Sequence, residues 1–179
     1  MTVAMTYSQL KVAVRDIVEA LEVWEKSYRV TLGITADTFE PTGNAPQTKE
    51  GVSEAFKAAQ RHSMPVFDGG CDKTIFSLAH DKDREGEYNQ LFRLQHDFCH
   101  HFFDCDFSYD GEISTFMAQS LVIGRAIRGF KGFISQSRIN RARTLLRCEI
   151  VGQAEYYRDT GNFVDDQLQF TLDYLGVTE

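Results

Sequence analysis

Two histidines four residues apart offer the clearest chemistry in this sequence. His96 and His100 lie in the segment LQHDFCHH, and Asp97 directly follows the first of them. Positions i and i+4 share one face of an α-helix, so both imidazoles can point at the same place. Two nitrogen ligands presented in this way are typical of a metal site. Asp97 lies about 100° further round the helix, where it could add an oxygen ligand or orient a histidine.

A carboxylate downstream completes the set. Eleven residues separate His100 from Glu112, and the segment CDFSYDG just before Glu112 is rich in turn-forming residues. We therefore expect a loop that reverses the chain, with Glu112 in the first turn of the next helix. The predicted ligands of a divalent metal are His96, Asp97, His100 and Glu112. The alternative is an ordinary core in which the histidines are paired buried polar groups.

The same residues resemble the motif of the coenzyme Q biosynthesis protein 4 family. That family carries His-Asp-x-x-His, then Gly-Glu at the spacing found here between His100 and Gly111-Glu112. The lead-in EYNQLFRLQHD and the continuation FMAQS are also similar, so the resemblance covers roughly residues 87–123. It implies a mostly helical fold, a zinc ion held by the motif residues, and a role in ubiquinone synthesis at a membrane surface.

The resemblance also implies a ligand, a prenylated ring intermediate whose head group lies by the metal. The aromatic side chains Phe98, Phe102 and Phe116 would wall the isoprenoid tail, and Arg125 and Arg128 would meet a phosphate or the membrane. An enzyme of this kind would act as a lyase or in an oxidative decarboxylation, with the metal polarising a substrate oxygen or activating water. A non-catalytic lipid-binding or scaffold protein is the alternative that stays open.

Two neighbours of the motif have less certain roles. His101 points about 100° away from His100, so it would support the site, act as a general base or meet solvent. Asp104 stands four residues after His100, on the same helical face if the helix continues. It could replace Asp97 as a ligand or fix one imidazole by a hydrogen bond.

A helical phosphohydrolase of the HD type is the second interpretation of the histidines. Such an enzyme acts on nucleotides and needs an early histidine, a central His-Asp pair and a late aspartate. The residues that fit these roles are His62, His96-Asp97 and Asp159 or Asp165. This assignment leaves His100 and Glu112 without a function. The sequence contains no phosphate-binding G-x-x-x-x-G-K-[ST] loop and no G-x-S-x-G nucleophile elbow.

The net charge of −7 conceals a basic segment. Between Ile113 and Cys148 the sequence has seven basic residues and no acidic one, so the remainder carries −14. The basic residues are Arg125, Arg128, Lys131, Arg138, Arg141, Arg143 and Arg147. They predict either a surface for phosphate or an anionic membrane, or ion pairs with neighbouring helices. We expect no nucleic-acid partner, and a homo-oligomer stays open.

These features belong to one domain, residues 1–179, long enough to bury a core. Apolar residues recur at steps of three and four over long stretches, and no sustained alternation demands strands. The helices expected cover residues 7–32, 49–61, 87–104, 111–129, 138–159 and 164–174, with a short piece at 73–79. The prediction is an all-α bundle of six or seven helices.

The cellular setting is predicted from segments that the sequence lacks. It has no run of eighteen apolar residues and no pattern of a signal peptide at its start. Its four cysteines form no C-x-x-C pair, which indicates reduced thiols. We expect a cytoplasmic protein, peripheral at the inner face of a membrane.

Overall fold

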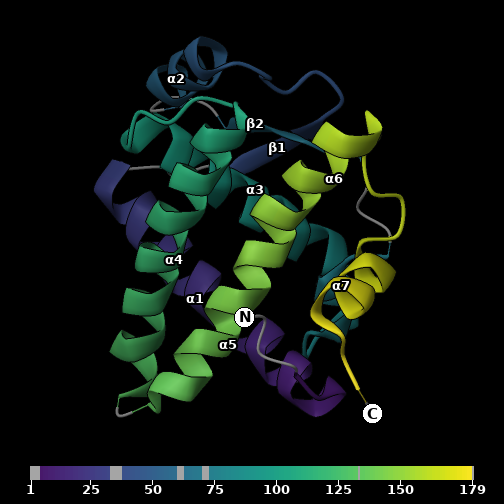
Figure 1. Cartoon of the computed structure of the whole chain (residues 1–179). Helices are drawn as coiled ribbons and strands as arrows, with labels where there is room; N and C mark the ends of the chain where they lie inside the picture. The colour runs from purple at the N-terminus through teal and green to yellow at the C-terminus, as the bar shows by residue number, and fades with distance from the viewer. Residues whose placement is uncertain (1–4, 33–37, 60–62, 70–72, 133, 179) are drawn as a thin grey trace.

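The protein is a bundle of α-helices, which confirms the predicted fold class (Figure 1). The computed structural model describes residues 5–32, 38–59, 63–69, 73–132 and 134–178. The elements in chain order are α1 (Tyr7–Leu32), β1 (Phe39–Thr42), α2 (Lys49–Ala58), β2 (Met64–Phe67), η1 (Ile75–Leu78), η2 (Lys82–Arg84), α3 (Glu85–Phe102), α4 (Tyr109–Lys131), α5 (Gln136–Arg147), η3 (Cys148–Gly152), α6 (Gln153–Thr160) and α7 (Gln167–Leu175).

Helix α1 lies at the centre of the bundle and contacts α3, α4 and α5. Its apolar residues recur at helical spacing, and Leu10, Val14, Ile17 and Leu21 are fully buried. Burying each such side chain is worth about 1.5–3 kcal/mol, so the core forms around this helix. Both chain ends meet beside it, because the N–H group of Tyr7 donates to the carbonyl oxygen of Thr178 at 2.8 Å.

The helix predicted for residues 138–159 is present but irregular. Helices α5 and α6 continue into each other through η3, a π-helical segment whose five residues are all buried. A π-helix closes hydrogen bonds over five residues instead of four, so one extra residue is accommodated without ending the helix. In Figure 1 the two helices form one long rod across the front of the molecule.

The fold also contains two short strands that the sequence did not predict, and they leave the all-α class unchanged. β1 and β2 pair in parallel, from Phe39 opposite Met64 to Thr42 opposite Phe67. Proline at positions 41 and 65 hides the pattern, because proline lacks the N–H group that a strand normally donates. A sheet of two short strands tolerates this since each strand has a free edge. Met64 and Val66 are buried, so the sheet caps one end of the core.

Helices α3 and α4 form the antiparallel pair that carries the histidine motif. Apolar side chains of α3, among them Tyr88, Leu91 and Leu94, are buried and fix its orientation in the core. Ser108 caps the start of helix α4: its side-chain oxygen accepts a hydrogen bond from the N–H group of Gly111 at 3.1 Å. This cap starts α4 just before Glu112, as the turn-rich loop predicted.

Among the described residues, none of the helices combines the length and the apolar character needed to cross a bilayer. Three cysteines, Cys99, Cys105 and Cys148, are buried free thiols. Burial raises the pKa of the Cys99 thiol to about 12, which keeps it protonated and unreactive at neutral pH. Cys71 lies outside the described residues.

Candidate metal centre

His96, His100 and Glu112 converge between α3 and α4. Their ligand atoms all lie within 4.8 Å of one another. The Nε2 atoms of the two histidines are 3.0 Å apart. Glu112 places Oε2 at 3.4 Å from His96 Nε2 and Oε1 at 3.5 Å from His100 Nε2. The structure therefore brings together three of the four predicted ligands.

These separations suit a zinc-sized ion. Ligands at 2.0–2.1 Å from zinc and at tetrahedral angles are about 3.3 Å apart. The three measured distances of 3.0, 3.4 and 3.5 Å lie close to that value. His100 is fully buried, whereas the side chains of His96 and Glu112 are 18% and 16% exposed. An ion held here would be reachable from one side.

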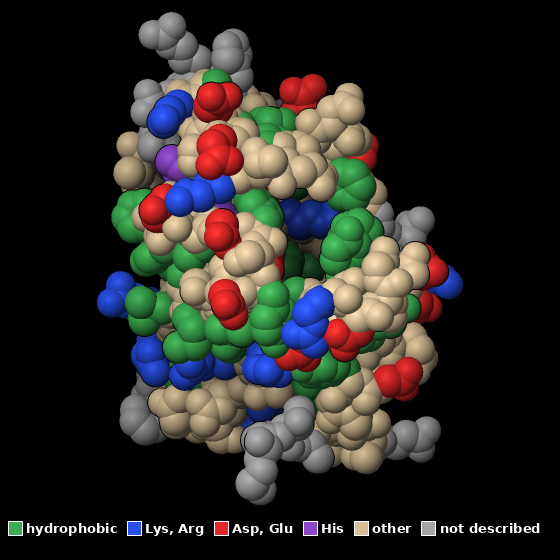
Figure 2. Space-filling model, turned by 45° about the horizontal axis from the view of Figure 1, so that its top comes forward, with side chains coloured by type: hydrophobic (Ala, Val, Ile, Leu, Met, Phe, Trp, Pro, Cys, Tyr) green, Lys and Arg blue, Asp and Glu red, His purple; other side chains and the backbone are tan. Residues whose placement is uncertain are grey.

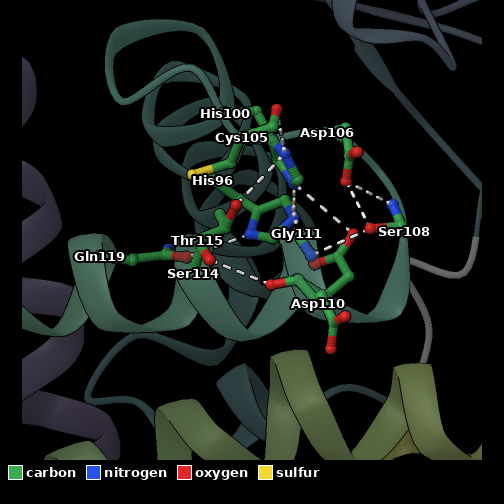
Figure 3. A network of polar contacts seen from close by, with 11 residues as sticks. His96, His100, Cys105, Asp106, Ser108, Asp110, Gly111, Ser114, Thr115 and Gln119 are labelled. Atoms are coloured by element: carbon green, nitrogen blue, oxygen red, sulfur yellow. Dashed lines mark hydrogen bonds and ion pairs between the residues drawn. The ribbon is translucent and has the colours of Figure 1, made fainter.

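The Nδ1 atoms of both histidines contact oxygen atoms (Figure 3). The Nδ1 atom of His100 lies 3.3 Å from the carbonyl oxygen of Cys105, and that of His96 lies 3.1 Å from Oε1 of Gln119. Both oxygens are acceptors, so these contacts favour the tautomers that carry the proton on Nδ1, although the Thr115 hydroxyl, 3.2 Å from His100 Nδ1, can either donate or accept. In the neutral imidazoles both Nε2 atoms then present lone pairs to each other. A cation between them removes the repulsion, and such outer hydrogen bonds are the usual support of metal-binding histidines.

The charges of the three residues are coupled. Burial by itself raises the pKa of Glu112, but the two histidines outweigh this effect and lower it to about 2. Burial alone lowers the pKa of His96, and the adjacent carboxylate of Glu112 reverses the direction, so that it is raised. A carboxylate that stays ionised beside two nitrogen donors is the donor set that divalent transition metals bind.

Asp97, predicted as the fourth ligand, lies outside this group of three. Burial raises the pKa of its carboxyl group to about 7, and the charge of His96 partly opposes the shift. The charges of His96 and Glu112 therefore act on the Asp97 carboxyl group, as expected for a residue one position beyond His96 on the helix. Its role as a ligand stays a prediction.

The loop between α3 and α4 sets the position of Glu112. The side chain of Asp106 accepts hydrogen bonds from the N–H group and the hydroxyl of Ser108, at 3.0 and 2.5 Å. Gly111 packs directly beneath Asp106, where a Cβ atom would overlap its carbonyl group. The glycine before Glu112 is therefore required by the close approach of the loop.

The two neighbours of the motif point elsewhere. His101 Nδ1 lies 3.0 Å from Ser53 Oγ of α2 and its ring stacks on Phe56. The side chain of Asp104 is 83% exposed and pairs with Lys49 at 2.6 Å. The expected face-sharing of Asp104 with the histidines fails because α3 ends at Phe102 and Asp104 has a positive φ of 59°.

The three aromatic residues expected to wall an isoprenoid tail have different surroundings. Phe98 packs into an aromatic cluster with Trp24, and Phe116 is buried in the core. Phe102 stacks on Phe98 but is 66% exposed. Phe102 is therefore the member of this set that a ligand could reach from solvent.

Sequence reasoning missed the residues that support the histidines. Thr115 Oγ1 lies 3.2 Å from His100 Nδ1, and Phe107 stacks on the His100 ring with centroids 4.0 Å apart. Thr115 and Gln119 follow Glu112 by three and seven residues, so they share its helical face. This spacing was the signal that could have identified both.

The residues proposed for an HD-type phosphohydrolase are not assembled in the described part of the chain. Asp159 is exposed on α6 and pairs with its neighbour Arg158 at 2.9 Å. Asp165 is also exposed, and neither aspartate belongs to the histidine group. His62 lies outside the described residues.

Comparison with known proteins adds no relative. No family model matches the chain, and no curated protein or solved structure is detectably similar to it. The likeness to the coenzyme Q biosynthesis protein 4 family therefore rests on the motif and its flanking residues alone.

Proposed function

We propose that the protein binds one divalent transition metal through His96, His100 and Glu112, and that zinc is the first candidate for this metal. The observation that carries the proposal is the pair of Nε2 atoms 3.0 Å apart, each on an imidazole whose Nδ1 is already hydrogen-bonded. In the tautomers that carry the proton on Nδ1, a cation between the two Nε2 atoms would replace the repulsion of their lone pairs. When bound, the metal would polarise a substrate oxygen or lower the pKa of a bound water.

Metal content tests this proposal directly. Purified protein is analysed by plasma emission spectroscopy, beside His96→Ala, Glu112→Gln and Asp97→Asn. His101→Ala is the matched control, since this histidine lies on the same helix but contacts Ser53 and Phe56. We expect about one metal per chain in wild type and control, and strong loss in the first two variants. Equal metal content in wild type and His96→Ala would refute the site, and the content of Asp97→Asn decides whether Asp97 is a ligand.

For the substrate we propose a prenylated precursor of a quinone ring. The protein would bind this precursor while associated with a membrane surface. The motif resemblance supports this class. The exposed aromatic side chains around the end of α3, namely Phe102, Phe103 and Phe107, offer an apolar approach next to the centre. The side chains of His96 and Glu112 are partly exposed, so the ring could approach the metal from their side.

Lipid extraction tests the substrate class. The protein is purified without detergent from a quinone-producing host, and extracts are analysed by mass spectrometry. Enrichment of prenylated phenols in wild type over His96→Ala would support the assignment. Turnover of nucleoside phosphates that disappears in His62→Ala would instead favour the phosphohydrolase, and an extract without prenylated compounds would count against the quinone role.

A further inference from the structure

A groove runs between α4 and α5 on the side of α4 that faces away from the histidines. Its volume of about 510 Å³ falls within the range of small-molecule sites. Leu121 in its lining follows Glu112 by nine residues, which is about 180° around the helix. The middle of the groove and the metal centre therefore lie on opposite faces of α4, while Phe103 and Cys105, which follow α3, line the end of the groove nearest His100.

The groove has an apolar wall that is open to solvent. Met117 and Leu121 line it and are 53% and 47% exposed, and Ile139 closes the side of α5. Ile113, one turn before Met117, continues the strip and is 36% exposed. A contiguous apolar strip of this kind on a protein surface is a mark of an interaction site.

Three polar groups in the groove suit an anion. Arg128 of α4 and Arg143 of α5 are the charged residues of its lining, and no carboxylate of the described residues pairs with either. A Cβ atom on Gly124 would lie 4.0 Å from Nη1 of Arg128, so this guanidinium folds back over the groove. Ser120 is 4% exposed, and its hydroxyl has no hydrogen-bond partner. A buried unpaired hydroxyl is costly, and a ligand oxygen would satisfy it.

Four arginines of the basic segment fall into two groups. Arg138 and Arg147 are used within the fold, where they pair with Asp16 and Glu155. Arg128 and Arg143 are left facing the groove. In Figure 2, Lys and Arg side chains lie next to hydrophobic ones on the left of the view, the side that α4 occupies in Figure 1.

We propose that this groove binds a single-chain amphiphile with an anionic head group, a phosphate monoester or a carboxylate. The chain would lie along Met117 and Leu121, and the head group would meet Arg128, Arg143 and the Ser120 hydroxyl. This site goes beyond the proposed function, because none of the residues proposed to bind the amphiphile is a metal ligand.

Charge and shape favour this ligand over larger partners. A second copy packed here by two-fold symmetry would set the same patch against itself, which brings arginines against arginines at a cost. A flat membrane surface would touch Met117 and Leu121 but would leave the buried Ser120 hydroxyl unpaired. A single alkyl chain with one anionic end can pack on the apolar wall and also bind the arginines and the Ser120 hydroxyl.

Calorimetric titration with dodecyl phosphate below its micelle concentration tests the proposal. We expect one molecule per chain, with binding at least about tenfold weaker for dodecanol, which lacks the charge, and for inorganic phosphate, which lacks the chain. The double variant Arg128→Gln/Arg143→Gln should bind dodecyl phosphate with an affinity lower by about tenfold or more. Gly124→Leu should block the groove. Gly129→Leu, on the same helix with nothing within 4 Å, and Arg125→Gln are the matched controls.

Three results would overturn the proposal. They are equal binding of dodecyl phosphate by wild type and the arginine double variant, binding to anionic phospholipid vesicles but not to dodecyl phosphate, and a dimer in light scattering that Leu121→Asp dissociates. Metal content measured on the same samples separates the two proposals. The groove variants should keep their metal, and His96→Ala should keep its affinity for dodecyl phosphate.

Discussion

Gly111 lies so close beneath Asp106 that a Cβ atom at this position would overlap the Asp106 carbonyl group. Glu112 is the next residue, so the loop and the carboxylate move together. We predict that Gly111→Ala displaces Glu112 and lowers zinc affinity by about tenfold, at a cost of roughly 1–3 kcal/mol in the free energy of unfolding. Competition with a chromophoric chelator measures the first quantity, and urea denaturation the second.

Gly129→Ala provides the control on the same helix. Nothing lies within 4 Å of a Cβ atom at Gly129, so alanine should leave zinc affinity unchanged and stabilise the helix by about 0.5–1 kcal/mol. Unaltered zinc affinity in Gly111→Ala would show that the loop does not position Glu112.

Gln119 orients His96 through the 3.1 Å contact between its Oε1 and Nδ1 of the imidazole. Gln119→Leu removes the acceptor and frees the ring to rotate. We predict a loss of about 10–100-fold in zinc affinity, measured by the same competition. Gln119→Glu retains an acceptor and should bind zinc at least as tightly as wild type. Equal affinity of Gln119→Leu and wild type would exclude this role.

The sequence was informative where the chemistry is local. His96, His100 and Glu112 lie within seventeen residues, and helical spacing plus one turn-rich loop suffices to bring them together. Asp104 was misplaced because its position depended on whether the helix continued past Phe102. The strands β1 and β2 could not be predicted, since their pairing joins segments more than twenty residues apart and depends on the core that they cap. The groove was equally hidden, because α4 and α5 form it jointly.

Metal binding should stabilise the fold, because the ligands join α3 to α4. A ligand present at about 1,000 times its dissociation constant adds about 4 kcal/mol to the free energy of unfolding. We therefore predict a gain of this size for wild type on saturation with zinc, measured by denaturant unfolding after chelator treatment. Glu112→Gln should show a much smaller gain. A wild-type protein that unfolds identically with and without zinc would contradict the proposed centre.

Arg138 neutralises a carboxylate in the core. The side chain of Asp16 is completely buried, and Arg138 donates to its two oxygens at 2.5 and 2.6 Å. We predict that Arg138→Met destabilises the protein by about 3–5 kcal/mol, since a buried carboxylate loses its ion pair with the guanidinium. The double variant Asp16→Asn/Arg138→Met should recover part of this loss. Urea denaturation measures both, and a cost below about 1 kcal/mol for Arg138→Met would show that the pair is dispensable.

Glu149 makes the stability of the fold depend on pH. It lies in the π-helical segment, accepts hydrogen bonds from Thr171 at 2.5 Å and Gln153 at 2.9 Å, and burial raises its pKa from 4.5 to about 7. Between these values the folded protein binds more protons than the unfolded chain, so stability falls as the pH rises. Above pH 7 the buried carboxylate is ionised, and this lowers the free energy of unfolding by on the order of 3 kcal/mol for a shift of this size.

We predict that Glu149→Gln removes this penalty, because glutamine keeps the acceptor for Thr171 without the charge. The stability of the variant relative to wild type should therefore rise between pH 5 and pH 8 and then level off. Denaturant unfolding at fixed metal concentration across this range measures the difference, which cancels the contributions of other groups. Glu54→Gln, at an exposed position on α2, is the matched control for the loss of one carboxylate. A difference for Glu149→Gln that stays constant across this pH range would show that Glu149 is not held protonated by the fold.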